Sequence, residues 1–596
     1  MKTLVIVESP AKAHHIQEYL GNNYIVKASK GHITELAKGG KHGLGVDIEN
    51  NFKPRYVLMA DKLDVMDELL ATAKKVDTIL VASDPDREGE AIAWHLADRL
   101  ADTGKPIKRV VFNEIKKAVV QKAVKSPRDI DINLFHSQEA RRILDRLVGF
   151  TASPFLMNYF GNNLSAGRVQ SVVTRMIIDR EREIENFIPE EFWTIHVKLS
   201  DGTDSFITKY DGKLTDETTA KKIKAGLDCP DYLIDKVIAV DEKKFPQPPL
   251  VTSTLQRIMS KQHNFSADRT MKAAQSLYEA GYCTYIRTDS VRVGEEALAD
   301  VRKWISDQKH EVPKKPHVYK NKEAAQDAHE CVRPSDINLL PWDNYAIANP
   351  DEKLVYETIW RCFVASQMIP AVYDTLSVTA HPSQNTSLKV KASGKALKVK
   401  GYLEIIGLTD NSQIDIPNLT VGQMVHLDTK TGGVKMEKKQ TQPLPRYSED
   451  KLIKELVNKN IGRPATYAEL LSRITLRNYV EKKGNVFHAT SLGKTITDEL
   501  KKYFTFMDYD YTAKMEQQLD EIEQGKINHI DMLKKFYPGY KNELNQAYIG
   551  HGTGECDLCG SPMVVRKAKL NGSSFLACTA YPKCRNTKNI LKTNVA

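Results

Sequence analysis

Hydrophobic and polar positions in the first hundred residues alternate between strand-like and helix-like patterns. The apolar run "TLVIVES" precedes the helix-like "AKAHHIQEYLG", and the apolar run "DTILVASD" precedes "EGEAIAWHLADRL". Short continuous apolar runs are typical of strands buried on both faces, and strands alternating with helices are typical of a parallel sheet. The pattern therefore predicts an α/β domain over residues 1–128, with helices covering a parallel sheet.

Beyond residue 128 the pattern predicts two helical regions, one region of strands and a small C-terminal module. The strand region alternates apolar and polar positions in two separate stretches, and a helical insert lies between them. A sheet interrupted in this way implies a discontinuous architecture. The predicted ranges are 129–190 and 445–548 for a basic helical domain, 191–247 and 371–444 for the strands, 248–370 for the insert, and 553–596 for the module.

Composition narrows the class of protein only slightly. The chain has 596 residues, 41% hydrophobic and 27% charged, which predicts several folded domains and excludes a disordered or fibrous protein. No apolar run approaches the roughly 18 residues of a membrane span, and the start "MKTLVIVESPAK" does not read as a signal peptide. We therefore expect a cytoplasmic protein without a membrane segment. The net charge of +10 favours polyanionic partners without deciding the matter.

An acidic cluster follows the second apolar run. Asp84, Asp86 and Glu88 lie at i, i+2 and i+4 directly after it, and in an extended chain their carboxylates fall on one side. Hard oxygen ligands beyond the carboxyl end of a strand suit Mg²⁺, and Glu8 at the end of the first run completes such a site. Lys12, one helical turn further, is placed to meet a phosphate. The alternative interpretation is an acidic turn that caps the following helix.

A tyrosine segment, "EAGYCTYIRTDS", offers a second candidate chemistry. Tyr285 and Arg287 lie at i, i+2 in a strand-like piece and point the same way. A phenol with a pKa of about 10 is a poor nucleophile at neutral pH, but a guanidinium beside it stabilises the phenolate and also holds a phosphate. Nothing local separates Tyr285 from Tyr282, and either fits an ordinary core aromatic.

Half of the eight cysteines crowd into the last 41 residues. Two close pairs separated by 18 residues suit one tetrahedral structural Zn²⁺ site, with free thiols as the alternative. From the first of these cysteines onward, seven Lys and Arg residues face one acidic residue, and Phe575 and Tyr581 lie among them, as a surface that stacks single-stranded bases requires. The predicted ligands are Cys556, Cys559, Cys578 and Cys584.

Eight motifs together carry a resemblance to a known family. "VIVESPAK" and "DPDREGEA" resemble the Toprim domain of topoisomerases, some primases and some nucleases, and "LYEAGYCTYIRTDS" closely resembles the active-site signature of type IA DNA topoisomerases. "FNEI", "EARRILDRLVGF", "LSAGRVQSV", "AHECVRP" and "IGRPATYAELL" extend the resemblance, in order, from residue 4 to about residue 530. "EGEAIAWHL" and the terminal cysteines are more similar to bacterial topoisomerase I than to topoisomerase III.

The resemblance implies a fold and a set of catalytic roles. The fold is multidomain: a Toprim α/β domain, helical domains and a β-rich arch form a torus, and a zinc ribbon-like module follows. Tyr285 attacks DNA and becomes linked to its 5′ phosphate, Arg287 stabilises charge, and Glu8 protonates the departing 3′ oxygen with Lys12 assisting. Mg²⁺ held by Glu8, Asp84, Asp86 and Glu88 aligns the ends for religation. His329, which with Arg333 is expected on one helix face, lies near the scissile phosphate.

The resemblance also implies a single-strand groove beside the active site. Arg142 and Arg146 form a like-charged i, i+4 pair that an anion would stabilise, whereas Arg141 and Asp145 also fit a surface salt bridge. Gly167 would let the backbone approach a sugar-phosphate chain. The expected DNA-binding residues are His32, Arg141, Arg142, Asp145, Arg146, Ser165, Gly167, Arg168, Gln170 and Arg477.

The sequence thus predicts a monomeric, ATP-independent type IA topoisomerase that relaxes negatively supercoiled DNA and prefers single strands. "GKT" at residues 493–495 lacks the earlier glycine of a nucleotide-binding loop, since His488 stands there. The alternatives are a topoisomerase III-like decatenase, a Toprim nuclease or primase that needs no covalent tyrosine, and a DNA-binding scaffold. A bacterial protein with this activity is expected at the nucleoid.

Overall fold

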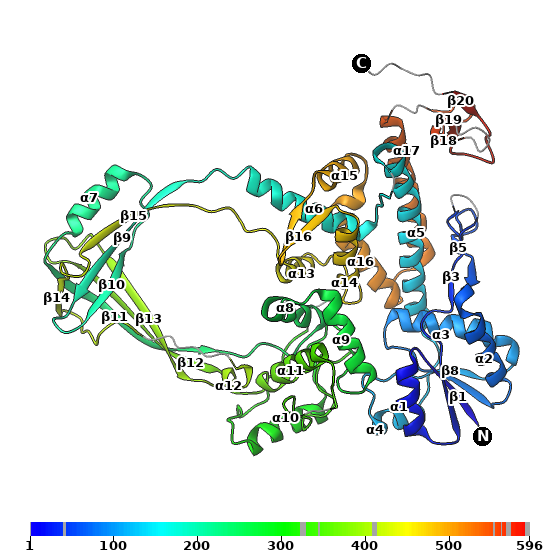
Figure 1. Cartoon of the computed structure of the whole chain (residues 1–596), viewed down its shortest axis with the longest axis horizontal. Coiled ribbons are helices and arrows are strands. Elements are labelled where there is room, and N and C mark those ends of the chain that lie inside the picture. Colours follow the sequence, from blue (N-terminus) through cyan, green and yellow to red (C-terminus); the bar gives the residue numbers. More distant parts are fainter. Residues whose placement is uncertain are drawn as a thin grey trace.

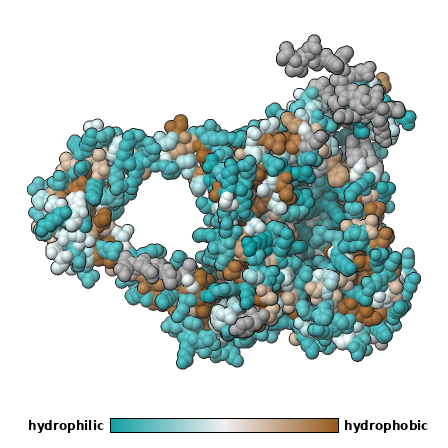
Figure 2. All heavy atoms as spheres, viewed as in Figure 1, coloured by the Kyte–Doolittle hydropathy of each residue, from teal (hydrophilic) through white to brown (hydrophobic). Residues whose placement is uncertain are grey.

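The chain folds into a ring with a small module at its C-terminal end (Figure 1). The computed structural model describes residues 2–39, 43–161, 163–321, 329–343, 346–407, 414–551, 555–561, 563–567 and 574–589. The space-filling view shows the opening through the ring, bounded by the β-rich arch on one side and the helical body on the other (Figure 2). Within the described ranges, no helix is long and apolar enough to cross a membrane.

The N-terminal domain is a four-stranded parallel sheet in the order β2-β1-β7-β8. Its strands are β1 (Thr3–Val7), β2 (Tyr24–Ala28), β7 (Thr78–Val81) and β8 (Ile107–Arg109), and its helices are α1 (Pro10–Leu20), α2 (Leu63–Ala73), α3 (Arg87–Leu100) and α4 (Lys117–Ala123). Leu4 and Ile6 pack on one face with α2 and α3, whereas Val5 and Val7 pack on the other with α1. Burial on both faces explains the continuous apolar runs. Small elements between them are β3 (Thr34–Leu36), β4 (Val46–Asp47), β5 (Lys53–Pro54), β6 (Tyr56–Leu58), η2 (Ala60–Lys62) and η3 (Ala101–Thr103).

The helical body is built around one long helix, α5 (Ile132–Phe160), whose first turn is capped by the Asp131 side chain. The α5 helix packs against α16 and α17, and α6 packs against α14 and α15. The other elements of the body are α6 (Arg168–Glu185), α13 (Glu449–Asn458), α14 (Tyr467–Leu476), β16 (Val480–Lys483), β17 (Val486–Ala489), α15 (Ser491–Tyr503), η4 (Thr505–Met507), α16 (Tyr509–Glu523) and α17 (His529–Gly550). One hydrophobic core combines α5 with α15, α16 and α17, and another combines α6 with α13 and α14. The two separate stretches of sequence therefore fold as one body.

The helical insert shares its core with the Toprim sheet. Leu255, Leu277 and Trp360 from the insert belong to the same buried cluster as Val5 and Ile16. The insert therefore packs directly on the face of the sheet that α1 and α4 cover. Its helices are α8 (Thr252–His263), α9 (Ala267–Glu279), α10 (Glu295–Asp307) and α11 (Pro350–Ala365). The short helix α12 (Leu403–Ile406), which follows β13 in sequence, packs against α11.

The arch is a seven-stranded sheet in the order β10-β13-β12-β11-β14-β9-β15. Its two longest strands, β11 and β12, pair antiparallel from Tyr232 opposite Pro382 to Lys244 opposite Ala371, although the whole insert separates them in sequence. The expected β-rich arch interrupted by helices is thus confirmed. Its elements are β9 (Glu191–Ser200), β10 (Ser205–Tyr210), α7 (Glu217–Leu227), β11 (Asp231–Lys244), β12 (Ala371–Pro382), β13 (Val390–Val399), β14 (Met424–Leu427) and β15 (Val434–Gln440).

The C-terminal module is an antiparallel sheet of β18 (Met563–Lys567), β19 (Ser574–Cys578) and β20 (Thr587–Asn589). It lies near the end of α17 (Figure 1). Val564 joins the hydrophobic core of α5 and α17, and Lys583 forms a 2.7 Å ion pair with Glu49 of the N-terminal domain. The module therefore contacts both the helical body and the N-terminal domain.

Candidate active site

The ends of two neighbouring parallel strands bring the first acidic residues together. Glu8 follows β1, Asp84 follows β7, and the Asp84 backbone N–H donates a 2.7 Å hydrogen bond to Glu8 Oε1. Lys12, in the first turn of α1, forms an ion pair with the Asp84 carboxylate. The Lys12 and Asp84 side chains are only 1% and 5% exposed, so this pair lies below the surface at the sheet edge.

Asp86 and Glu88 have different positions from those that an extended chain predicts. Helix α3 begins at Arg87, and Asp86 caps it by accepting a 2.8 Å hydrogen bond from Gly89 N. Glu88 lies inside the first helical turn and contacts His32 and Gln138. The expectation that Glu88 shares one side with Asp84 and Asp86 is wrong, because the chain has already turned into a helix. A Cβ at residue 89 would lie 2.1 Å from the Asp84 carbonyl oxygen, so this turn requires glycine.

Part of this cluster fits a magnesium ion. Burial, followed by the nearby Asp84 charge, raises the pKa of Glu8 to about 7, and burial also raises the pKa of Asp84. A divalent cation would relieve this crowding, and carboxylate oxygens are the ligands that Mg²⁺ prefers. The described carboxylates of this acidic set do not bring three ligand atoms within 4.8 Å of one another. The donor chemistry therefore fits Mg²⁺, while a four-carboxylate cage is not preformed.

Glu88 is the least available of the four carboxylates. Burial alone would raise its pKa, but the hydrogen bond and charge of His32 outweigh burial and lower the pKa of Glu88 to about 2. Glu88 therefore already has a favourable partner. His32, expected at DNA, instead contacts this predicted metal ligand.

Tyr285 reaches the same edge of the sheet from the helical insert. Its hydroxyl donates a hydrogen bond to Asp86, and its backbone N–H donates a 2.8 Å hydrogen bond to the Asn113 carbonyl of the N-terminal domain. The Tyr285 side chain is buried, and burial together with the Asp86 charge raises the pKa of its hydroxyl well above its usual value. Tyr282, which the sequence did not separate from Tyr285, instead has its ring 6.2 Å from that of Tyr356.

Arg287 faces the same carboxylate as Tyr285. Its Nη1 lies 3.7 Å from Asp86 Oδ2, so the i, i+2 spacing does place both side chains on one target. Burial would lower the pKa of Arg287, but the charges of Tyr285 and Asp86 outweigh burial and raise that pKa. The guanidinium is therefore fully charged beside the tyrosine hydroxyl.

His329 lies beside Tyr285, although not on a helix. The two ring centroids are 5.8 Å apart, and burial lowers the pKa of His329, which keeps the imidazole neutral near pH 7. The expected helix face shared by His329 and Arg333 is wrong, because Val332 N donates to Leu250 O and Thr284 N donates to Arg333 O in bridge-like pairing. Arg333 instead pairs with Glu114 and Glu330.

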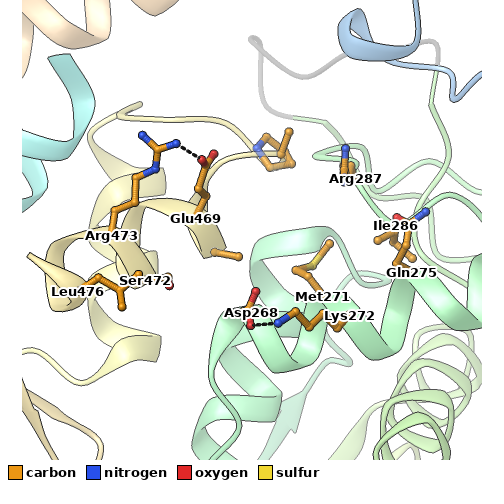
Figure 3. Close-up of a pocket in the computed structure, with 13 residues that line it drawn as sticks. Asp268, Met271, Lys272, Gln275, Ile286, Arg287, Glu469, Ser472, Arg473 and Leu476 are labelled. Atoms are coloured by element: carbon orange, nitrogen blue, oxygen red, sulfur yellow. Dashed lines mark hydrogen bonds and ion pairs between the residues drawn. The ribbon is translucent and has the colours of Figure 1, made fainter. Parts of the chain in front are cut away.

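A cleft opens beside the buried tyrosine, between α9 and α14 (Figure 3). Its volume is about 650 Å³, and Arg287 and Ile286 are among the residues that line it. Lys272 and Arg473 on the facing helices pair with acidic residues of their own helices, as the dashed lines show. Arg287, whose side chain is 35% exposed, therefore borders open space in this cleft.

The basic residues of α5 differ in their availability. Arg142 forms no ion pair with any residue in the described ranges, and Arg146 stacks 4.1 Å from the centre of the Phe150 ring. Arg141 lies 3.8 Å from Asp145 Oδ2, close to the surface salt bridge considered from the sequence. Within the described ranges, Arg142 and Arg146 are therefore the arginines of this group that form no ion pair with a carboxylate.

Arg168 is fully buried, which sequence reasoning did not anticipate. Its guanidinium forms a 2.7 Å ion pair with Glu516 of α16 and a 3.3 Å pair with Asp145. In this structure the ion pairs of Arg168 therefore link α6 to α16 and α5, and its side chain does not face solvent. A direct contact between Arg168 and DNA stays a prediction that requires this pair to open.

The remaining groove residues lie around the start of α6 and the end of α14. Gly167 precedes α6, and a Cβ there would make only ordinary contacts at 3.4 Å, so packing does not require this glycine. Gln170 donates a 3.4 Å hydrogen bond to the Ser165 hydroxyl. Arg477, at the end of α14, donates a 2.9 Å hydrogen bond to the Asn163 carbonyl. Their contacts with DNA stay predictions.

A charged cluster that sequence reasoning missed joins the N-terminal domain to the helical body. Arg87 of α3 pairs with Asp520 and with Glu523 of α16, and Arg463 in the "IGRPATY" motif pairs with Asp520 at 2.5 Å. Arg87 is more than 400 residues away in sequence from each of its two acidic partners. Only the basic members stand inside recognisable motifs, so the acidic members carried no local signal.

The four C-terminal thiols converge as predicted. Their sulfur atoms all lie within 4.8 Å of one another, with Cys556 3.6 Å from Cys584 and Cys559 3.4 Å from Cys578. Asn586 and the Ala580 backbone N–H donate hydrogen bonds to two of these sulfurs. A tetrahedral thiolate set with hydrogen bonds to its sulfurs fits Zn²⁺.

Comparison with known proteins agrees with this architecture. A DNA topoisomerase family model matches residues 129–534, a Toprim domain model matches residues 3–115, and a topoisomerase DNA-binding C4 zinc finger model matches residues 553–593. The solved structure of full-length topoisomerase I from Thermotoga maritima, in a monoclinic crystal form, is 34% identical to this chain. That match covers 99% of this chain and 97% of the other, with a TM-score of 0.81.

The chain belongs to the type IA DNA topoisomerase family. It is an isomerase that acts on DNA and relaxes it by a topoisomerase I-like mechanism, and the predicted fold class is confirmed. A Toprim domain usually binds Mg²⁺, and the C4 zinc finger with its converging cysteines indicates zinc. DNA is the partner.

Proposed function

We propose that this topoisomerase relaxes negatively supercoiled DNA without ATP by cutting one strand through Tyr285, passing another strand through the gap and resealing it. One observation carries the assignment. Tyr285 and Arg287 both face the Asp86 carboxylate, at the strand ends that also hold Glu8, Asp84 and Lys12. Nucleophile, positive charge and proton donor thus meet in one place.

In the proposed cleavage step one bond to phosphorus forms, another breaks, and two protons are transferred. The Tyr285 oxygen attacks the phosphorus and loses its proton toward Asp86, whose carboxylate already accepts that hydrogen bond. The bond from phosphorus to the 3′ oxygen breaks, and Glu8 protonates the departing oxygen. With a pKa of about 7, Glu8 is protonated often enough near neutral pH to serve as this acid. Arg287 and Lys12 supply positive charge at the phosphate.

Religation reverses these steps, because the phosphotyrosine link conserves the energy of the broken bond. Glu8, Asp84, Asp86 and Glu88 are the residues that would hold Mg²⁺, and the bound ion would supply positive charge to align the ends. His329, with its ring near Tyr285, helps to orient the reacting groups. Torsional strain in the DNA drives the cycle, so no nucleotide is required.

The proposed gate lies between the insert and the N-terminal domain. Tyr285 belongs to the insert and Asp86 to the Toprim domain, so the Tyr285 to Asp86 hydrogen bond spans the two. Opening the gate breaks this contact and leaves the cut 5′ end on the insert. We infer that the strand reaches Arg287 through the cleft between α9 and α14.

Single-stranded DNA is the proposed preferred form of the partner, and a monomer the proposed working state. Arg142 and Arg146 supply charge on α5, and His32, Arg141, Asp145, Ser165, Gly167, Arg168, Gln170 and Arg477 complete the proposed groove. We propose one tightly bound structural Zn²⁺, at Cys556, Cys559, Cys578 and Cys584. Because its partner is DNA, the proposed place of action is the nucleoid.

A labelled oligonucleotide tests the chemistry. After denaturation, a single-stranded oligonucleotide labelled at its 3′ end should leave label on the protein, because Tyr285 retains the 5′ phosphate, and a 5′ label should not. Supercoiled plasmid should relax with Mg²⁺ and without ATP. A Toprim nuclease would cut without any adduct, and a scaffold would do neither. Efficient unlinking of catenated circles without relaxation would favour the decatenase.

A further inference from the structure

A second group of metal-ligating side chains lies outside the proposed active site and the cysteine module. His136 and Glu139 stand at i, i+3 near the start of α5, and His529 is the first residue of α17. One ligand atom from each of the three lies within 4.8 Å of the other two. Among the described residues, only this group and the four cysteines meet that criterion.

The three side chains are close but weakly bonded. His529 Nε2 lies 3.5 Å from Glu139 Oε2, and the His136 and His529 rings stack with centroids 3.9 Å apart. The Tyr56 hydroxyl donates a 3.3 Å hydrogen bond to the other oxygen, Glu139 Oε1. In the described part of the chain, no ring nitrogen of His136 makes a hydrogen bond.

Glu139 is a buried carboxyl that has no Lys or Arg partner among the described residues. Its residue is 7% exposed, and no Lys or Arg of the described ranges lies within ion-pair distance of it. Burial raises the pKa of Glu139 to about 7, and burial, followed by the nearby His136, lowers the pKa of His529 to about 4. Burial also lowers the pKa of His136.

We propose that His136, Glu139 and His529 bind a divalent transition-metal ion of the Zn²⁺ class, which joins α5 to the start of α17. Two imidazoles and one carboxylate are a donor set that suits zinc, with a fourth position open to water. Zinc bonds to such ligands are about 2.0–2.2 Å long. The ligand atoms lie within 4.8 Å of one another, and His529 Nε2 is already 3.5 Å from Glu139 Oε2, so rotation of the two rings out of their stack brings them to such bond lengths.

The position of the site links three parts of the fold. His136 and Glu139 belong to α5, His529 to α17, and the Tyr56 hydroxyl that contacts Glu139 comes from β6 of the N-terminal domain. Helix α17 leads directly into the C-terminal module. A bound ion would hold the start of α17 against α5 and would supply the positive charge that buried Glu139 lacks.

Metal analysis of the full chain tests this site. After EDTA dialysis that leaves the cysteine site filled, we expect the wild-type chain to bind one further equivalent of Zn²⁺ at micromolar concentrations. Glu139→Gln preserves the shape of the side chain and should weaken this second binding at least 10-fold, and His136→Ala with His529→Ala should abolish it. His14→Ala, on the exposed surface of α1, is the matched control and should bind like wild type.

Cobalt absorption identifies the ligands independently. In a chain carrying Cys578→Ser and Cys584→Ser, added Co²⁺ should give weak visible bands of a nitrogen and oxygen site without thiolate charge-transfer bands. Adding Glu139→Gln should remove those visible bands. Equal second-site binding in wild type and Glu139→Gln, or no Co²⁺ bands in the cysteine variant, would overturn the proposal. None of these readouts depends on cleavage or relaxation, so the proposed function stands or fails separately.

Discussion

The hydroxyl of Tyr285 donates a hydrogen bond to Asp86, and the same Asp86 carboxylate caps helix α3. The carboxylate therefore has two roles, one in holding the start of α3 and one in meeting the side chain of another domain. The cap interpretation and the catalytic interpretation of the acidic cluster are compatible, because Asp86 uses one oxygen for each contact. In the proposed cycle, only the contact with Tyr285 breaks.

Replacing Tyr285 with Phe should abolish the covalent adduct and plasmid relaxation. Only one hydroxyl is lost, and the Asp86 cap of α3 stays, so binding to a single-stranded oligonucleotide should remain within about twofold of wild type, since one exchanged polar contact contributes little. Tyr282→Phe is the matched control and should retain the adduct. An adduct in Tyr285→Phe would assign the nucleophile to another residue.

The double variant Asp84→Asn with Asp86→Asn should impair religation more than cleavage. Asn caps a helix about as well as Asp, so α3 should persist, while the charge that holds Mg²⁺ is lost. Without the Asp86 carboxylate the Tyr285 proton passes to water, which slows cutting. Lys12 and Arg287 stay at the phosphate, so cutting continues, and cleaved oligonucleotide accumulates because religation is impaired more. Relaxation with an unchanged Mg²⁺ dependence would mean that these carboxylates serve only to shape the helix start.

Cleavage should depend on the protonation of Glu8. Burial raises its pKa to about 7, so the acid form that donates a proton to the 3′ oxygen is present below pH 7 and is lost as pH rises through that value. In single-turnover cleavage of an oligonucleotide with EDTA present, the rate should fall about tenfold per pH unit above this point, as expected for one titrating acid. Glu8→Gln should be slow throughout and lack this limb. A limb that persists in Glu8→Gln would belong to another group.

Local sequence predicted the strand ends well, because the residues there are adjacent in sequence to the buried runs that place them. Glu8 and Asp84 follow β1 and β7, and parallel pairing of those strands brings them together. The geometry around Glu88 differed from expectation, because where α3 begins depends on the Asp86 cap. Because α3 begins at Arg87, its first turn directs the Glu88 carboxylate to His32.

The sequence did not allow us to predict which residues far apart in the chain form hydrogen bonds or ion pairs with each other. The segment with His329 and Arg333 is extended because its hydrogen-bond partners are Leu250 and Thr284, far earlier in the chain. Arg168 has its partner Glu516 348 residues away. Periodicity reports the face that a residue occupies on its own element, and it carries no information about which distant side chain meets that face.

The Arg168 and Glu516 pair should contribute strongly to stability. Burial would raise the pKa of Glu516, but the guanidinium groups of Arg141, Arg168 and Arg463 outweigh burial and hold that pKa well below its usual range. Stability from this group is therefore present above the unfolded pKa of about 4.3 and is lost as pH falls. Removing one partner of a buried pair costs about 3–5 kcal/mol.

Thermal unfolding measures this effect. Glu516→Gln should lower the Tm clearly at pH 7, and the difference should shrink only well below about pH 4.3, as pH falls toward the depressed pKa of Glu516 in the folded protein. Asp145→Asn is the control, because Asp145 is 49% exposed and its pair with Arg168 is longer. Equal Tm values for wild type and Glu516→Gln at pH 7 would show that the buried pair does not stabilise the fold.

Truncation of the C-terminal module should weaken DNA binding while leaving strand cleavage in place. Deleting residues from Gly554 onward leaves every proposed catalytic residue in place, so Tyr285 should still cleave a single-stranded oligonucleotide. The deletion removes the Val564 packing on the helical body and the Lys583 pair with Glu49, together with the basic surface of the module. Binding should weaken, and its salt slope should flatten by about 0.7 per lost phosphate contact on single strands.

Processive relaxation should suffer more than cleavage, because relaxation requires holding DNA through repeated openings. The four thiolates set the fold of the module, so Cys578→Ser with Cys584→Ser should lose the one zinc that resists EDTA dialysis and should reproduce the binding defect of the truncation. The scattered Cys362, converted to Ser, is the control and should keep both zinc and salt slope. An unchanged salt slope in the truncated chain would show that the module makes no phosphate contacts.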